Sequence, residues 1–242
     1  MPKPIILAHR GSSAYAPENT MDAFALAIEQ GADGIELDVH LTADGQVVVC
    51  HDDTIHRMSE GSGVVEELTY AQLRQHNFST GLPGYDTPTY APLLSEVLTL
   101  FEPTEMIINI EIKSSPTSYP QLEEKTVALV LASSMASRIL YSSFNHDSMV
   151  YVKSIDPAAQ VALLYAERLT RAWEYAHMIG CDALHPHFRS ISQEMVSASQ
   201  AAGVDVNVWT VDGPEDITTM INMGVHGIIT NKPDVALDLR AK

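Results

Sequence analysis

Short apolar runs alternate along the chain with segments whose apolar residues recur at helical spacing. Helical patterns cover 19–30, 94–101, 121–134 and 192–203. Strands are predicted for IILAHR (5–10), GIELDVH (34–40), QVVVCHD (46–52), EMIINIEIK (105–113), RILYSS (138–143), QVALLY (160–165), CDALHP (181–186), DVNVWT (205–210) and GVHGIITNKP (224–233). Eight of these runs can lie parallel, with 46–52 as an extension of the second strand.

Strands that alternate with helices predict right-handed βαβ units and a parallel sheet. Eight such units in roughly 250 residues fit a closed (β/α)8 TIM barrel. An open doubly wound sheet is the alternative, but the first turn, AHRGSSAYAPENT, lacks the G-x-G-x-x-G spacing of a dinucleotide site. We therefore predict an α/β fold with a single TIM barrel domain over 1–242. Residues 52–92 would form a small insertion after strand 2 that can fold over the mouth.

Composition limits the kinds of partner and compartment. Of the 242 residues, 45% are hydrophobic, which is enough for one large core. The formal charge of −17 argues against nucleic acid or an anionic membrane surface as a partner, so we expect no stable membrane association. Cys50 and Cys181 are too few for a disulfide framework and favour a reducing compartment. No apolar stretch approaches the ~18 residues of a membrane span, and only MPKPIILA precedes His9, so we expect a cytoplasmic protein.

Polar residues occupy strand ends that would otherwise be apolar. They are His9, Arg10, Glu36, Asp38, His51, Asp52, Glu111, Lys113 and Trp209. In a TIM barrel the chemistry lies at the C-terminal ends of the strands, so these side chains would meet at one face. Singly, each has an ordinary explanation, such as a core histidine, a surface charge or a packed aromatic ring. Their coincidence at one end of one barrel favours a functional site.

The acidic residues in this set predict a metal site. Glu36 and Asp38 are two apart on a strand, so both leave from one face, about 6.5 Å apart along the backbone. Their apolar neighbours in GIELDVHL would face the helices, which turns the acids inward. Buried carboxylates repel each other unless a cation or a shared proton compensates them. With Glu111 on the next strand, three carboxylates would surround one point and suit Mg²⁺ or Ca²⁺, and Lys113 would add positive charge for a phosphate oxygen.

Several linked motifs resemble those of one family. HRG(x)6ENT, GIELDVHLTADGQVVVCHD, NIEIK, VWTVD (208–212) and GIITNKPD (227–234) together resemble the glycerophosphodiester phosphodiesterase family over essentially the full length. The resemblance implies a (β/α)8 barrel with a small insertion after strand 2. It also implies hydrolysis of small-molecule glycerophosphodiesters to sn-glycerol 3-phosphate and an alcohol, with a divalent metal such as Mg²⁺ or Ca²⁺ as cofactor.

The same resemblance assigns roles to individual residues. The implied general acid/base pair is His9 and His51, and the implied metal ligands are Glu36, Asp38 and Glu111. The residues expected to bind substrate are Arg10 and Lys113 at the phosphate, Trp209 at the glycerol moiety or the mouth, and His185 in the pocket. Glu18 is expected to orient Arg10 or to cap the following helix.

The mechanism stays open at two points. A phosphodiester repels nucleophiles and has a basic leaving group, so the reaction needs positive charge and two groups that transfer protons. The nucleophile is either water or the substrate's own 2-hydroxyl, which would give a cyclic phosphate that water opens in a second step. The sequence does not decide between these routes, nor which histidine acts first as the base.

Three other functions share parts of this pattern. A lysophospholipase D or sphingomyelinase D-like enzyme of the same superfamily has the barrel and both histidines, but it needs a groove for an acyl chain, of which 52–92 gives no hint. A non-enzymatic sensor barrel would be expected to have lost a catalytic histidine. A metal-dependent lyase or isomerase would more naturally use a strand-end lysine as a Schiff base, and the strong candidate, Lys113, would be kept charged by Glu111. Hydrolysis is favoured, and a homo-oligomer is compatible with the sequence.

Overall fold

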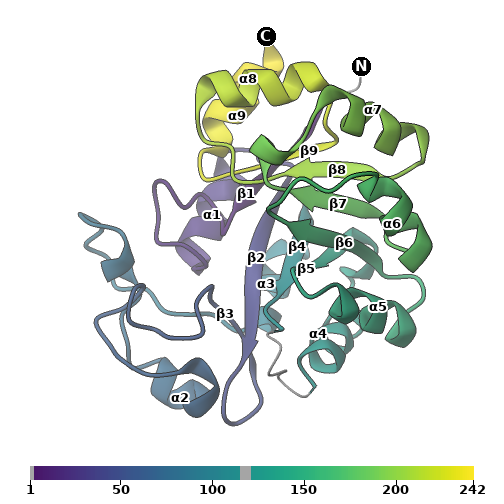
Figure 1. Ribbon diagram of the computed structural model, residues 1–242. Coiled ribbons are helices and arrows are strands. Elements are labelled where there is room, and N and C mark those ends of the chain that lie inside the picture. Colours follow the sequence, from purple (N-terminus) through teal and green to yellow (C-terminus); the bar gives the residue numbers. More distant parts are fainter. Residues whose placement is uncertain (1–2, 115–120) are drawn as a thin grey trace.

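The computed structural model describes residues 3–114 and 121–242, and a closed barrel forms its centre (Figure 1). The strands are β1 (Ile5–His9), β2 (Gly34–Leu41), β3 (Val47–Val49), β4 (Ile107–Ile112), β5 (Ile139–Ser143), β6 (Gln160–Tyr165), β7 (Ala183–Pro186), β8 (Asp205–Val208) and β9 (Gly227–Thr230). The helices are α1 (Met21–Glu29), α2 (Tyr70–Leu73), α3 (Leu94–Phe101), α4 (Leu122–Leu131), α5 (His146–Ile155), α6 (Ala172–Ile179), α7 (Gln193–Ala201), α8 (Pro214–Met223) and α9 (Pro233–Ala241). This architecture confirms the predicted (β/α)8 TIM barrel. Within the described residues, no helix has the length and apolar content to cross a bilayer.

Hydrogen bonding between the first and last strands closes the barrel. The order around it is β1-β2-β4-β5-β6-β7-β8-β9, and β1 pairs with both β2 and β9. Neighbouring strands in this ring are all parallel, so their C-terminal ends lie at the same face. β3 instead runs antiparallel to β2, with Val49 opposite Val39, and forms a hairpin with the end of β2.

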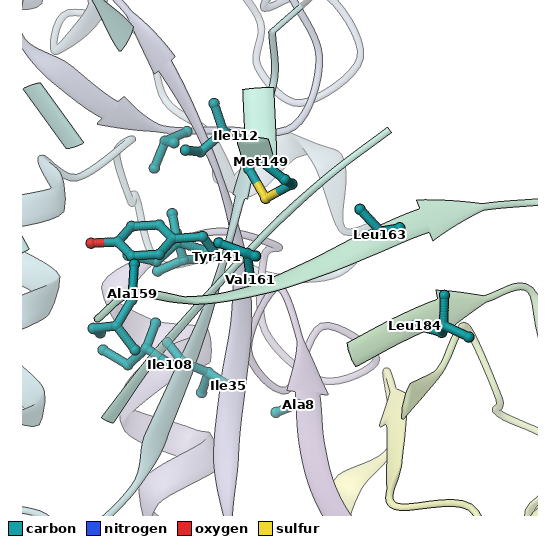
Figure 2. Packing of buried hydrophobic residues seen from close by; sticks show 14 of the residues in the cluster. Ala8, Ile35, Ile108, Ile112, Tyr141, Met149, Ala159, Val161, Leu163 and Leu184 are labelled. Carbon is teal, nitrogen blue, oxygen red and sulfur yellow. The ribbon is translucent and has the colours of Figure 1, made fainter. Parts of the chain in front are cut away.

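Alternation along β2 separates the apolar core from the barrel interior. Ile35, Leu37 and Val39 are fully buried in the main apolar cluster, together with helix residues such as Phe24 and Phe101. Figure 2 shows neighbouring strands contributing further members of this cluster. Because successive side chains on a strand point to opposite faces, the acids of GIELDVHL point into the barrel.

Helix α1 begins and ends at residues with clear chemical roles. Thr20 is the N-cap, and its hydroxyl accepts a hydrogen bond from the Ala23 amide at 3.3 Å. Gly31 follows the helix with a φ of +73°, a left-handed conformation that glycine adopts without strain. Because Thr20 caps the helix, the neighbouring Asn19 side chain is available for a contact inside the barrel.

The segment between β3 and α3 builds a small core of its own. Its apolar residues pack with the end of β3 in a second apolar cluster, which consists of Val48, Cys50, Ile55, Met58, Val65, Leu73, Phe78 and Ala91. In Figure 1 this segment, including α2, lies to one side of the barrel. Its description as an insertion over 52–92 within a single domain stays a prediction.

Candidate active site

The turn after β1 holds His9 and Arg10 at the C-terminal end of the barrel. Arg10 and Gly11 have φ values of +57° and +79°, so the chain changes direction within two residues. A Cβ on Gly11 would lie 2.7 Å from the carbonyl carbon of Ala23, and glycine therefore lets the turn pack against α1. The turn also directs the Arg10 amide at Glu36, whose Oε2 accepts its hydrogen bond at 3.0 Å.

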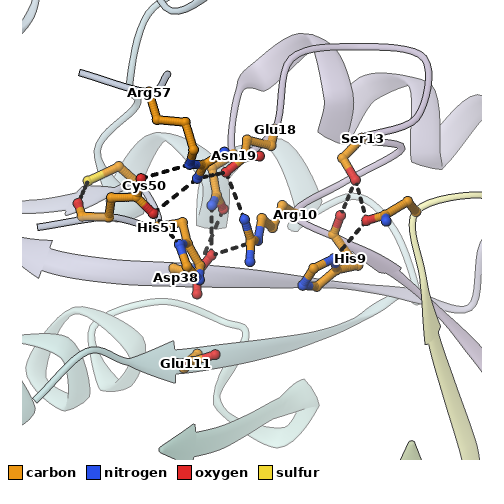
Figure 3. Close-up of polar contacts among 12 residues, drawn as sticks. His9, Arg10, Ser13, Glu18, Asn19, Asp38, Cys50, His51, Arg57 and Glu111 are labelled. Atoms are coloured by element: carbon orange, nitrogen blue, oxygen red, sulfur yellow. Dashed lines mark hydrogen bonds and ion pairs between the residues drawn. The ribbon is translucent and has the colours of Figure 1, made fainter. Parts of the chain in front are cut away.

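Three carboxylates converge inside the barrel. Glu36, Asp38 and Glu111 are buried, and each offers an oxygen that lies within 4.8 Å of the others. The register of β2 and β4 places Asp38 opposite Glu111, and Figure 3 shows the two residues on these neighbouring strands. Asn19 Nδ2 donates to Asp38 Oδ2 at 2.7 Å, which fixes the orientation of that carboxylate.

Burial makes this acidic cluster electrostatically unfavourable without a cation. It raises the pKa of Glu36 well above the ordinary value, and the charges of Asp38 and Glu111 raise it further. Burial also raises the pKa of Glu111 to about 7. Asp38 differs: despite its burial, Lys113 and Arg10, at 2.9 and 3.5 Å, hold its pKa well below the usual range. Three converging carboxylate oxygens are the donor set that Mg²⁺ and Ca²⁺ prefer, so these residues fit the predicted cofactor.

His9 is held by an uncharged partner from the other end of the chain. Asn231 Nδ2 donates to Asp212 Oδ2 at 2.6 Å, so the amide oxygen of Asn231 faces His9. That oxygen lies 2.7 Å from His9 Nδ1, which assigns the proton to Nδ1 and leaves Nε2 as the basic nitrogen. Burial, and then the charge of Arg10, lower the pKa of His9 to about 4. The imidazole is therefore neutral at neutral pH.

His51 is held by a charged partner. Its Nδ1 lies 2.5 Å from Asp52 Oδ1, and Arg57 donates to the same carboxylate (Figure 3). Burial would raise the pKa of Asp52, but the hydrogen bonds from Arg57 and His51 hold it at about 2. The pKa of His51 is lowered, chiefly by burial and also by the charges of Lys113 and Arg10, and the charge of Asp38 and the Asp52 hydrogen bond offset this only in part. An imidazolium at this position has a carboxylate to stabilise it, which His9 lacks at its Nδ1.

A cavity at the barrel mouth brings most of the predicted site residues together. It is lined by His9, Arg10, Glu36, His51, Asn109, Glu111, Lys113, Phe144, Leu164, Trp209, Thr210 and Ile229. Lys113 Nζ lies 2.6 Å from Glu111 Oε1 and 2.9 Å from Asp38 Oδ1, so its ammonium pairs with two of the acids. Phe144 and Trp209 meet edge to face at 5.5 Å and give the cavity one aromatic side.

His185 is not among the residues that line this cavity. Its side chain is fully buried inside the barrel, where Nε2 lies 3.0 Å from Asn207 Nδ2. Burial lowers the pKa of His185 to about 3, so it is neutral. The backbone carbonyl of His185 accepts a hydrogen bond from Trp209 Nε1 at 2.7 Å, which holds the indole at the cavity edge.

Four residues that shape this site were not predicted from the sequence. They are Asn19, Arg57, Asn109 and Asn231. Asn109 is two positions before Glu111 and so shares its face, which is a signal that strand alternation could have supplied. Within the described residues, its buried Oδ1 has no hydrogen-bond partner. Nothing in the sequence pattern marks Arg57, because it lies in the irregular segment after β3.

Comparison with known proteins agrees with this geometry. Residues 9–235 match the model of the Glycerophosphoryl diester phosphodiesterase family. The chain belongs to this family of phosphoric diester hydrolases. The glycerophosphodiester phosphodiesterase of Caldanaerobacter subterraneus subsp. tengcongensis is 39% identical over 99% of both chains, and that of Bacillus altitudinis is 36% identical over 97% of both. The resemblance seen in the sequence motifs is thereby confirmed.

Solved structures of similar proteins share the fold over nearly the whole chain. A phosphodiesterase of Oleispira antarctica, solved in complex with the product sn-glycerol-3-phosphate, gives a TM-score of 0.91 at 26% identity and covers 99% of this chain and 98% of that one. A glycerophosphodiester phosphodiesterase of Parabacteroides distasonis gives a TM-score of 0.85 at 28% identity, over 99% and 97% of the two chains. The elements that carry the candidate site are therefore shared elements of the fold.

Proposed function

We propose that this chain hydrolyses glycerophosphodiesters to sn-glycerol 3-phosphate and an alcohol in the cavity at the barrel mouth, with a divalent metal. Family membership supports the reaction class, and the product complex of the Oleispira antarctica protein supports the small-molecule product. The observation that carries the proposal is the arrangement of two imidazoles and an acidic cluster around one cavity.

The acidic cluster is the proposed metal site. Glu36, Asp38 and Glu111 would hold Mg²⁺ or Ca²⁺, because their oxygens converge within 4.8 Å and are buried. A bound divalent cation would neutralise charge on the phosphate oxygens during the reaction. Arg10 and Lys113 line the same cavity and would bind the remaining phosphate oxygens as hydrogen-bond donors. Both side chains stay protonated at neutral pH, since the neighbouring carboxylates raise the pKa of both groups.

The two histidines would transfer the protons. His9 is neutral and presents Nε2, so it would accept a proton from the nucleophile. His51 is backed by the Asp52 carboxylate, which stabilises an imidazolium, so it would donate a proton to the leaving oxygen. The nucleophile is water or the 2-hydroxyl of the glycerol. In the second route the histidines exchange roles when water opens the cyclic phosphate.

Trp209 and Phe144 would contact the organic part of the substrate. The indole is held by the His185 carbonyl, and the exposed Phe144 ring packs against it. A cavity lined by aromatic rings and by charged groups suits a molecule with a phosphate at one end and carbon-bound hydrogens at the other. His185 itself would act only through its carbonyl. A cytoplasmic location and self-association of the chain remain predictions from the sequence.

A substrate panel tests the proposal. Release of sn-glycerol 3-phosphate is measured from glycerophosphocholine, glycerophosphoethanolamine and glycerophosphoglycerol, with a lysolipid in parallel and with Mg²⁺ or Ca²⁺ supplied. We expect turnover of at least one of the three glycerophosphodiesters and little of the lysolipid. Turnover of the lysolipid alone would replace the proposal by the lysophospholipase D alternative, and no product from any of them would reject it.

A further inference from the structure

We propose that Arg57 is a positioning residue that holds both halves of the active site in place: His51 through Asp52, and Arg10 through Glu18. The inference rests on the proposed function, because it assigns Arg57 a part in that reaction. Arg57 lies in the segment between β3 and α3. It is not among the residues that line the cavity, so it acts through the two carboxylates.

All three guanidinium nitrogens of Arg57 are engaged. Nε and Nη2 donate to the two oxygens of Asp52 at 2.7 and 3.0 Å. Nη1 and Nη2 donate to the two oxygens of Glu18 at 2.9 and 2.7 Å. One guanidinium thus donates hydrogen bonds to two carboxylates, and both oxygens of each carboxylate accept. A lysine has a single nitrogen and cannot reproduce this planar double contact.

Each of these two carboxylates also contacts a residue that lines the cavity (Figure 3). Asp52 Oδ1, which accepts from Arg57, is also the oxygen 2.5 Å from His51 Nδ1. Glu18 Oε1, which accepts from Arg57, also accepts from Arg10 Nη1 at 2.8 Å. His51 and Arg10 are therefore fixed relative to each other by one shared guanidinium. One residue is the proposed proton donor and the other a proposed phosphate ligand.

The backbone of Arg57 is anchored independently of its side chain. Ile55 and Met58 on either side are buried in the second apolar cluster, and the Ser59 amide donates to the Ile55 carbonyl at 3.0 Å. The Arg57 side chain itself is 49% exposed, so it fills no part of that core. Its replacement would leave the packing of the segment intact and remove only the polar contacts.

Loss of Arg57 would disturb both sides of the site together. Asp52 and Glu18 would no longer share a cation, so their charges would repel each other and both side chains could rotate. His51 and Arg10 would then lose their fixed orientations. We expect kcat to fall because His51 is misplaced and KM to rise because Arg10 is misplaced. The loss of a purely structural contact would lower the amount of folded protein but would not change kcat and KM together.

Steady-state kinetics of Arg57 variants test the proposal. For R57A we expect kcat/KM on glycerophosphocholine to fall about 10²-fold, the typical effect of misplaced catalytic groups. R57K keeps the positive charge but not the planar group that contacts both carboxylates, so we expect nearly the same loss of kcat/KM. Guanidinium chloride at millimolar concentration should restore part of the R57A activity and leave the wild type unchanged. R57Q serves as a second variant if R57A is poorly folded by circular dichroism.

Arg74 provides a matched control in the same segment. Its guanidinium lies 5.0 Å from the ring centre of Tyr90, away from the cavity lining, so R74A should keep wild-type kcat and KM and show no response to guanidinium. Folded R57A or R57Q with wild-type kinetics would overturn the proposal. Wild-type kinetics of R57K would also overturn it, since charge alone would then suffice.

A measurement without turnover separates this inference from the proposed function. The pKa of His51 can be followed by NMR titration of its imidazole in wild type and R57A. Without Arg57, Asp52 can rotate away from His51, and the hydrogen bond that acts to raise this pKa is lost, so we expect the pKa to fall; Asp38, Lys113 and Arg10 also act on it. An unchanged pKa would count against Arg57. A wild type that hydrolyses no glycerophosphodiester would reject the proposed function, and the titration would still decide the role of Arg57.

Discussion

The two histidines of the cavity are supported by different parts of the molecule. His9 ends β1, and its partner Asn231 follows β9, the strand that pairs with β1 to close the barrel. His51 follows β3, outside the ring of eight parallel strands, and depends on Asp52 and Arg57. One side is thus built by the barrel itself, with a neutral amide at Nδ1 of His9 and the Glu36 carboxylate 3.9 Å from Nε2. The other is built by the segment after β3, with ion pairs.

This difference separates the chemistry of two residues of one type. An amide oxygen can orient an imidazole but adds no net charge, so burial keeps His9 neutral. A carboxylate orients an imidazole and also stabilises its protonated form, as Asp52 does for His51. In the proposed mechanism, the same side chain therefore serves as base on one side and as acid on the other, according to its partner.

Among the substitutions that test this comparison, removal of the His9 or the His51 imidazole should lower activity most. We expect H9A and H51A each to lower kcat by about 10²–10⁴-fold, because each removes a proposed proton-transfer group. Neither substitution removes apolar packing, so thermal unfolding should stay close to that of the wild type. Near-wild-type turnover of one variant would mean that its side of the site is not catalytic.

Changes to the partners should sharpen the contrast. D52N removes the carboxylate that acts to raise the pKa of His51, so His51 loses its proton at lower pH. The alkaline limb of the pH–rate profile should therefore move to lower pH. At a pH above the limb, the rate should fall about tenfold for each pH unit by which the limb moves. N231A removes a neutral hydrogen bond, worth about 0.5–1.5 kcal/mol, and should cost about 2–10-fold in kcat. Its pH profile should move less than that of D52N. Equal shifts in the two profiles would contradict the distinction between a charged and a neutral partner.

His185 offers a smaller test, on stability. Its folded pKa is lowered to about 3 by burial, from 6.5 in the unfolded chain, so the unfolded state binds the proton first. Stability is therefore fully present above pH 6.5 and is lost as the pH falls toward 3, by about 1.4 kcal/mol per pH unit at most. Urea unfolding at pH 7 and pH 5 should show a smaller acid loss for H185Q than for wild type. Parallel losses would mean that His185 is not buried as a neutral group.

Much of the barrel side could be predicted from the sequence because strand periodicity is a strong constraint. The spacing of Glu36 and Asp38 within an alternating strand sets which face they share, and the parallel order brings Glu111 beside them. The turn residues Arg10 and Gly11 follow the first strand directly, so their position at the barrel end also follows from the chain order.

Other contacts could not be predicted because they depend on how distant segments pack. Glu18 and Arg57 meet only after the segment beyond β3 folds beside the barrel, and no spacing rule links them. Asn231 lies 222 positions from His9, and only closure of the barrel brings them together. For His185, the end of a strand was a sound position for a cavity residue, but its side chain is buried inside the barrel.

The role of the acidic cluster is tested most directly by metal removal. The rate of sn-glycerol 3-phosphate release from glycerophosphocholine is measured after treatment with EDTA and again after Mg²⁺ or Ca²⁺ is added back. We predict a fall of at least about 10²-fold on chelation, since a catalytic cation supplies several kcal/mol to the transition state, and recovery with one of the two ions. An unchanged rate in a demonstrably metal-free preparation would contradict the assignment of Glu36, Asp38 and Glu111 as metal ligands.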